Sequence, residues 1–192
     1  MSESSTFSVF QLGKYPATRA LGQDGRGRLD DLLGEREDID LTIDFAGVEV
    51  MNISFADEFL GKFLTSHDFS AKGTLVKIAG LNADNYYSVV VCIERRETQV
   101  VAVDQEDNLV LVGDKMLADT FEQTIQLGSF KANELAERMS LTAQNANNRL
   151  KRLAEAGAVR KAQVTGSTRG GREYLYGVPS AAVSDCERLT LA

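Results

Sequence analysis

The first half of the chain shows two kinds of hydrophobic periodicity. Residues 39–45 (IDLTIDF) alternate apolar and polar side chains, and residues 74–79 (TLVKIA) are a short apolar run, so both predict β-strands. Phenylalanine and leucine recur at helical spacing in residues 55–65, and residues 82–97 begin with an Asn-Ala-Asp-Asn cluster suited to capping a second helix. The order strand–helix–strand–helix predicts βαβ units, and hence an α/β (α+β) fold in which helices pack on a mixed sheet.

Weaker patterns flank these elements. Residues 1–6 are polar and are expected to form a frayed tail, while residues 28–33 are a candidate short helix. Two β-rich runs, at 99–103 and 109–112, surround the sequence Asp-Gln-Glu-Asp-Asn and predict a hairpin. This hairpin either closes a first domain or connects it to a second one.

Helical spacing of apolar side chains returns at 114–127 and ends near Gly128. We therefore expect a domain boundary at about residue 113. The chain would then consist of a first domain at 1–113, a second domain at 114–180 and a C-terminal tail at 181–192.

The second domain continues with two more helices and two strands. The helix at 131–139 is followed by a turn and by a helix that Thr142 caps and Gly157 ends. Two strands then flank the loop 165–172, Thr-Gly-Ser-Thr-Arg-Gly-Gly-Arg. The glycines and arginines of this loop predict a flexible cationic tip suited to contact with phosphate or with a minor groove.

Charge is distributed unevenly along the chain, whose net charge is −7. Residues 1–113 hold 10 Lys/Arg against 19 Asp/Glu, whereas residues 114–192 hold 11 against 9. Within 138–172 there are eight basic residues and one acid, Glu155. An acidic half joined to a half with a basic patch indicates a localised polyanion site, although a solvated charged face would give the same count.

The helix that follows Thr142 combines this charge with a polar face. Ala146, Leu150 and Leu153 fall on one side, so amides and cations occupy the other side. Amide side chains can form two hydrogen bonds with an adenine edge, so this face is a candidate DNA contact. The alternative is a polar face that contacts only solvent. The candidate DNA-contacting residues are Thr142, Gln144, Asn145, Asn147, Asn148, Lys151 and Arg152 on the helix, with Arg169 and Arg172 on the loop.

Residues 131–178 resemble the winged helix-turn-helix superfamily of bacterial regulators, in the style of the MarR and ArsR families. The resemblance rests on ELAERMSLTAQNANNRLKRLAEAGAV and the Gly-Arg-rich hairpin after it. It implies that residues 142–152 form a recognition helix, that 165–172 form the wing, and that the partner is double-stranded DNA. Such repressors usually dimerise to read a palindrome, so we expect a homodimer with 114–127 as its candidate interface. Some winged helices bind protein instead, and the acidity of the whole chain leaves that alternative open.

Residues 44–58, DFAGVEVMNISFADE, resemble the STAS fold of anti-sigma-factor antagonists and, more closely, a STAS-like bacterial family of unassigned function. The resemblance covers residues 19–97. In antagonists of this type, a partner kinase phosphorylates a serine at the helix start and thereby breaks a protein–protein contact. Ser54 stands at the matching position.

The pattern around Ser54 departs from that of the antagonists. Asn-Ile precedes the serine where Asp-Ser is usual, and the acids Asp57 and Glu58 would repel a phosphate. Ser54 is therefore either a phosphorylation site or, as we favour, the N-cap of the helix, with Asp57 or Glu58 completing a capping box. Phosphorylation or partner binding is the candidate role of these three residues.

Patterns of catalytic and metal-binding residues are weak. Cys92 and Cys186 lack metal-ligand spacing, and Cys92 lies in an apolar run typical of a core. The carboxylates of Asp44, Asp57 and Glu58 could converge near a strand end, but no histidine, cysteine or phosphate loop accompanies them. We predict no enzymatic activity, no cofactor and no metal site.

The expected function is that of a cytoplasmic, sequence-specific transcription regulator. No export signal is seen, and no apolar run approaches the roughly 20 residues that span a bilayer. The STAS-like domain would sense a protein or small ligand and the winged helix would bind DNA. The alternative is a partner-switching module that binds a kinase-type ATPase or an anti-sigma-like partner, with the winged helix used for protein contact.

Overall fold

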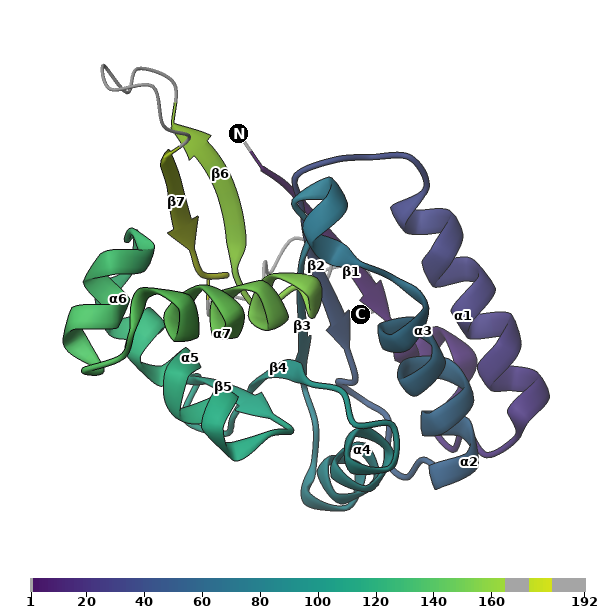
Figure 1. The fold of residues 1–192 in the computed structure, drawn as a ribbon. Coiled ribbons are helices and arrows are strands. Elements are labelled where there is room, and N and C mark those ends of the chain that lie inside the picture. Colours follow the sequence, from purple (N-terminus) through teal and green to yellow (C-terminus); the bar gives the residue numbers. More distant parts are fainter. Residues whose placement is uncertain (1, 165–172, 181–192) are drawn as a thin grey trace.

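A five-stranded sheet organises residues 2–112 in the computed structural model, which describes residues 2–164 and 173–180 (Figure 1). The strand order is β1-β2-β3-β4-β5; β1 to β4 run parallel, and β5 is antiparallel to β4. The predicted α/β class and mixed sheet are therefore confirmed, as are the two predicted strands and the hairpin. The strands are β1 (Glu3–Ser8), β2 (Ile39–Asp44), β3 (Leu75–Ala79), β4 (Val100–Val103) and β5 (Leu109–Val112).

Helices cover one face of this sheet, because alternate strand residues there are apolar. Leu41 and Ile43 of β2 are buried with Phe55, Phe59 and Phe63 of the facing helix. That helix is continuous, with a π-helical turn in its middle. The elements are η1 (Val9–Leu12), α1 (Arg19–Leu33), α2 (Ile53–Ala56), the π turn η2 (Asp57–Gly61), α3 (Lys62–Ser66), η3 (Phe69–Lys72) and α4 (Ala83–Arg95).

The expected frayed tail at residues 1–6 is wrong. Residues 3–8 form the edge strand β1, paired in parallel with β2 from Glu3 opposite Ile39 to Ser8 opposite Asp44. Backbone pairing determines this strand, since Phe7 is its one buried side chain. The polar sequence of β1 gave no strand pattern, because pairing with β2 and not side-chain burial determines this strand.

The helix predicted at 28–33 is much longer, since α1 begins at Arg19. Its buried stripe is Gly22, Gly25, Leu29 and Leu33, so glycines occupy the first two positions where a hydrophobic pattern would be expected. A Cβ on Gly22 would lie 3.1 Å from the Phe55 carbonyl oxygen, so the glycine allows α1 to approach α2 closely.

The described residues of the C-terminal unit form three helices and a two-stranded antiparallel sheet. Phe130 extends that sheet by a bridge to Tyr176, and the two rings stack at 5.7 Å. The predicted loop 165–172, with Arg169 and Arg172, and the predicted tail 181–192 lie outside the described residues. The elements are α5 (Lys115–Leu127), α6 (Ala132–Arg138), α7 (Ala143–Glu155), β6 (Arg160–Val164) and β7 (Glu173–Gly177).

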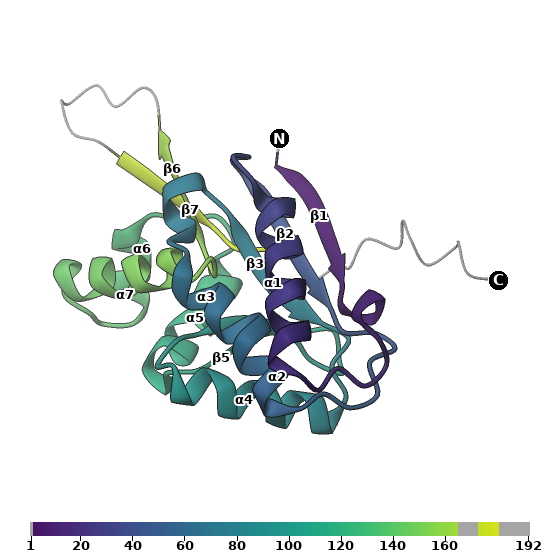
Figure 2. The same cartoon turned by 90° about the vertical axis from the view of Figure 1, so that its right-hand side faces the viewer.

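The C-terminal unit packs against the strands on the side away from α1 (Figures 1 and 2). Val101 of β4 and Leu111 of β5 belong to its apolar core, while Val100 and Val112 belong to the core under α1–α4. The hairpin thus contributes to both cores because its side chains alternate between the two faces. The division at residue 113 stays a prediction.

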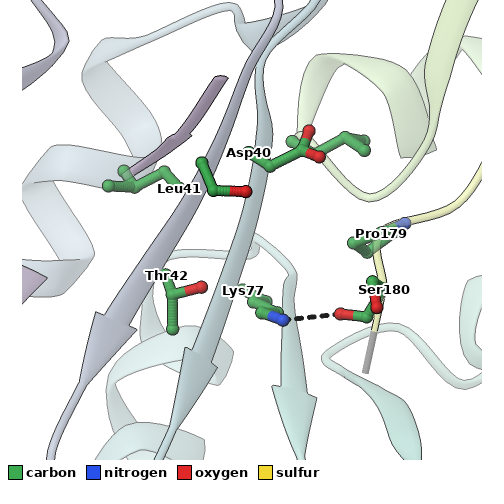
Figure 3. Close-up of a pocket in the computed structure, with 8 residues that line it drawn as sticks. Asp40, Leu41, Thr42, Lys77, Pro179 and Ser180 are labelled. Carbon is green, nitrogen blue, oxygen red and sulfur yellow. Dashed lines mark hydrogen bonds between the residues drawn. The ribbon is translucent and has the colours of Figure 1, made fainter. Parts of the chain in front are cut away.

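Polar contacts also join the two units. The β3 amide of Val76 donates to the carbonyl of Gly157 at 2.9 Å. Lys77, 6% exposed, donates from Nζ to the Ser180 carbonyl at 2.5 Å across a cavity of about 50 Å³ (Figure 3). Burial lowers the pKa of the Lys77 ammonium. The chain after β7 is thereby held on the sheet face.

Within the described residues, no helix is both long enough and apolar enough to cross a membrane.

Candidate nucleic-acid interface

The helix α7 is capped and packed as its sequence predicts. The Thr142 hydroxyl accepts a hydrogen bond from the Asn145 amide at 3.2 Å, and Ala146, Leu150 and Leu153 are buried. Gly157 adopts a φ of +71° after the helix. A left-handed residue ends a helix readily when it is glycine, so the chain turns directly into β6.

The opposite face of α7 brings six of the predicted contact residues together in solvent. Lys151 is the most open of its two cations, with 75% of its side chain exposed, against 43% for Arg152. This face is continuous because its members recur at spacings of three and four along one helix. The exposed residues are Gln144, Asn145, Asn147, Asn148, Lys151 and Arg152; Thr142, at the cap, is exposed as well.

Local contacts occupy some of these side chains. Arg152 donates from Nη2 to Asp114 Oδ2 at 3.3 Å, and Lys151 lies 3.7 Å from Glu155. Asn147 donates to the Ala143 carbonyl within its own helix at 2.9 Å. Three amides of this face form no side-chain hydrogen bond within the described part of the chain: Gln144, Asn145 and Asn148.

Arg149 positions α7 and was missed from the sequence. Its Nη1 donates to Thr120 Oγ1 on α5 at 3.0 Å, and Thr120 is fully buried. The two residues are 29 positions apart in the sequence, so helical spacing could not predict this hydrogen bond.

Lys161 on β6 is a further exposed cation beside the helices. Its Nζ lies 3.8 Å from the centroid of the Tyr174 ring on β7. Residues 161–163 are all exposed, so Gln163 also faces solvent. Strand alternation does not single out Lys161, because three consecutive residues of β6 are exposed; its place in the basic segment 138–172 is the one sequence signal.

The second set of predicted site residues lies at the start of α2. Asn52, not Ser54, caps this helix: its Oδ1 accepts the Ser54 amide at 2.7 Å and its carbonyl accepts the Ala56 amide at 3.0 Å. The N-cap role predicted for Ser54 is therefore wrong, because the helix begins at Ile53. Ser54 is half-buried in the first turn.

Asp57 and Glu58 are engaged in ion pairs and do not form a capping box with Ser54. Asp57 accepts hydrogen bonds from both Nε and Nη2 of Arg96, the C-cap residue of α4, at 2.6 and 2.9 Å. Glu58, with 8% of its side chain exposed, pairs with Lys62 at 2.7 Å and with Arg26 of α1 at 3.5 Å. These pairs join α1 and α4 to the π turn.

Of the three carboxylates considered for a metal site, Asp44 lies apart from Asp57 and Glu58, which both approach Arg19. Asp44 accepts the Ala46 amide at 2.9 Å and lines a depression with Asp104 and Asp107, away from the ion pairs of Asp57 and Glu58. The described residues contain no group of three or more His, Cys, Asp or Glu side chains able to hold a metal.

Cys92 lies in the core, as predicted from its apolar run. Burial raises the pKa of its thiol to about 11, so the group is protonated at neutral pH. A protonated, buried thiol is a poor nucleophile.

The Asp57–Arg96 pair predicts a change in acid stability. The Arg96 hydrogen bonds lower the pKa of Asp57 below its usual value, so the stabilisation is complete above about pH 4 and is lost as pH falls through the folded-state pKa. We expect Asp57→Asn to be less stable than the parent at pH 6, and this gap to narrow between pH 4 and 3. Urea unfolding at each pH measures it.

Asp24→Asn is the matched control, since Asp24 pairs with Arg28 at 2.8 Å in solvent, where ion pairs contribute little. A gap for Asp57→Asn that stays constant down to pH 3 would contradict the assigned role of Arg96.

Comparison with known proteins identifies one part of the chain. No curated protein and no solved structure matches it. Residues 28–86 match the family model described as a STAS-like domain of unknown function (DUF4325). This segment lies inside the predicted resemblance at 19–97 and contains β2, β3 and the helix between them. Residues 28–86 are therefore similar to a STAS-like domain.

Proposed function

We propose that the chain is a transcription regulator in which a winged helix-turn-helix, formed by α5–α7 and the β6–β7 hairpin, binds double-stranded DNA. The STAS-like domain would receive the signal, and no catalytic role is proposed. The order of three helices and an antiparallel hairpin supports this assignment. In such modules the second helix of the helix-turn-helix enters the major groove.

The observation that carries the proposal is the exposed face of α7. Amides and cations gather there on a 13-residue helix, and its first turn contains no acid. A helix N-terminus carries unpaired amide N–H groups and a partial positive charge, which attract phosphate. Amides further along the helix would then reach base edges, where Asn and Gln recognise adenine. Arg169 and Arg172 on the predicted wing would add phosphate or minor-groove contacts.

A homodimer remains part of the proposal because such regulators read palindromic sites. The exposed side of α5 is polar except for Met116, which is 41% exposed. Dimerisation through α5 would therefore rely on polar contacts around that methionine.

Replacing Gln144 with alanine tests the reading face. We expect the variant to bind a duplex selected from a random pool about 1–3 kcal/mol more weakly, because one bidentate base contact is lost. Binding to an unrelated duplex should be unchanged, since phosphate contacts remain. Gel shifts over a series of salt concentrations measure both quantities.

Gln105→Ala, in the β4–β5 loop and exposed, is the matched control. Equal loss in the two variants, or no binding to any duplex at low salt, would count against a DNA-reading α7.

A second candidate function is a partner-switching module that binds a protein, such as a kinase-type ATPase. Large apolar side chains are exposed around the start of α2: Phe10 is 37% exposed, Tyr15 63% and Val50 50%. The Asn52 amide donates to the Pro16 carbonyl at 3.1 Å, so these loops are adjacent. Capture of an ATPase that depends on Tyr15 and Val50, in a protein that shifts no duplex, would favour this function.

A further inference from the structure

An open cleft of about 410 Å³ separates the end of α4 from the starts of α5 and β4. Volumes of this size accommodate small ligands, and ligand sites often lie where two units meet. Residues from both units line it: Ile93, Glu94, Glu97, Thr98, Gln99, Gly113, Asp114 and Arg152.

The walls of this cleft are acidic. Glu94 and Glu97 at the end of α4 are exposed, and Asp114 opposite them is half-buried. Arg152 is the single cation among the lining residues, and its Nη2 is 3.3 Å from Asp114 Oδ2. Hydrogen bonds from the Leu117 amide and then from Arg152 lower the pKa of Asp114. Three carboxylates therefore face one guanidinium.

The Gln99 side chain is an independent reason to expect a ligand with N–H donors in this cleft. Its side chain lines the cleft, yet the residue is only 8% exposed, and Oε1 has no hydrogen-bond partner within the described residues. A buried acceptor left unpaired costs free energy, so such groups usually have a partner. Oε1 is itself buried, so an N–H donor in the cleft would pair with it once the amide turns toward the cleft.

The base of the cleft is closely packed and already formed. A Cβ on Gly113 would lie 2.7 Å from the Thr98 carbonyl oxygen, so the chain after β5 lies against the segment before β4 without space for a side chain. Glu97 adopts a φ of +50°, which turns the chain sharply out of α4 and back toward Gln99. A ligand would therefore bind between walls that need little rearrangement.

We propose that this cleft binds a small organic cation that carries N–H donors, an amine or a guanidine. The carboxylates of Glu94 and Glu97 would neutralise its charge, and Gln99 would accept a hydrogen bond from it. A compound without N–H groups leaves Gln99 unpaired, and an anion meets three carboxylates. The cleft should therefore discriminate by both charge and donor content.

Binding would be coupled to DNA through Arg152, a step that rests on the function proposed above. A cation that pairs with Asp114 competes with Arg152 for that carboxylate. The freed guanidinium, on the exposed face of α7, would then contact a phosphate. The ligand is thus expected to strengthen DNA binding, and by reciprocity DNA would strengthen ligand binding by the same factor.

The test begins with the full-length protein alone, titrated calorimetrically with 1,4-diaminobutane as the probe. Tetramethylammonium, a cation without donors, and succinate, an anion, are the comparison compounds. We expect binding of the diamine only. Glu97→Gln and Gln99→Met should each weaken it by about tenfold, the size of a lost hydrogen bond to a charged group. Glu106→Gln, an exposed acid outside the cleft, should leave it unchanged.

Two results would overturn the site: no heat with the diamine up to millimolar concentration, or equal affinity in the parent and in Glu97→Gln. Because Glu97 is exposed, the latter variant is expected to fold even if Gln99→Met does not. The effect of the diamine on DNA binding is a separate measurement. Diamine binding without any effect on gel shifts would retain the site and refute only its coupling through Arg152, whereas absence of any shifted duplex would refute the proposed function alone.

Discussion

Replacing Arg160 with methionine is expected to destabilise the protein by about 3 kcal/mol, as when one partner of a largely buried ion pair is removed. The Arg160 side chain is 19% exposed, and Nη2 donates to Asp40 Oδ1 at 2.5 Å and to the Ile39 carbonyl at 3.1 Å. Its Nε donates to the Gly73 carbonyl at 2.6 Å. Methionine fills similar volume but leaves a carboxylate and two carbonyls without these donors. Urea unfolding at neutral pH measures the loss.

The same substitution should also weaken the connection between the two units, because Arg160 begins β6 and its partners lie on β2 and beside β3. We expect unfolding to become less cooperative, with a lower m-value or two transitions, since a single transition needs strong coupling. Lys161→Met is the matched control on the adjacent exposed position, where only a cation–π contact of about 0.5–1 kcal/mol is at stake. Equal losses for Arg160→Met and Lys161→Met would contradict the role assigned to Arg160.

Arg160 also indicates how far the sequence predicts this structure. Local features were predictable: Asn82 and Thr142 cap the helices they were expected to cap, and Gly157 ends α7. Each of these depends on residues a few positions away. The contacts of Arg160 lie 87 to 121 positions back in the chain, so no spacing could indicate them.

The candidate DNA-contacting face and the cleft beside it show the same contrast between local and long-range features. The exposure of Gln144, Asn148 and Lys151 follows from helical periodicity alone, because their neighbours on the other face are apolar. The cleft beside that face was not predicted. It is lined by Gln99 before β4, Asp114 before α5 and Arg152 of α7, which lie far apart in the chain. Capping at Asn52 was missed because Ser54 is an equally good cap by residue type.

The largest error in secondary structure, the missing half of α1, leads to the second prediction. Replacing Gly22 with valine is expected to cost about 3 kcal/mol, at the upper end for overpacking. Its Cβ would meet Glu58 Cβ at 3.0 Å, the Phe55 carbonyl oxygen at 3.1 Å and the Phe59 amide nitrogen at 3.2 Å. Two of these three atoms belong to the backbone of α2 and the π turn, so they cannot move aside as a flexible side chain can.

Gly27→Val is the matched control on the same helix, since a Cβ there has no neighbour within 4 Å. Valine forms helix better than glycine, so this variant should be neutral or stabilised by roughly 0.3 kcal/mol. Chemical unfolding of the two variants separates helix propensity from packing. If both substitutions had the same effect, α1 would not lie directly on α2. A large loss at Gly22 alone would establish that glycine, which no hydrophobic pattern reveals, determines how closely α1 approaches the helix that carries Asp57 and Glu58.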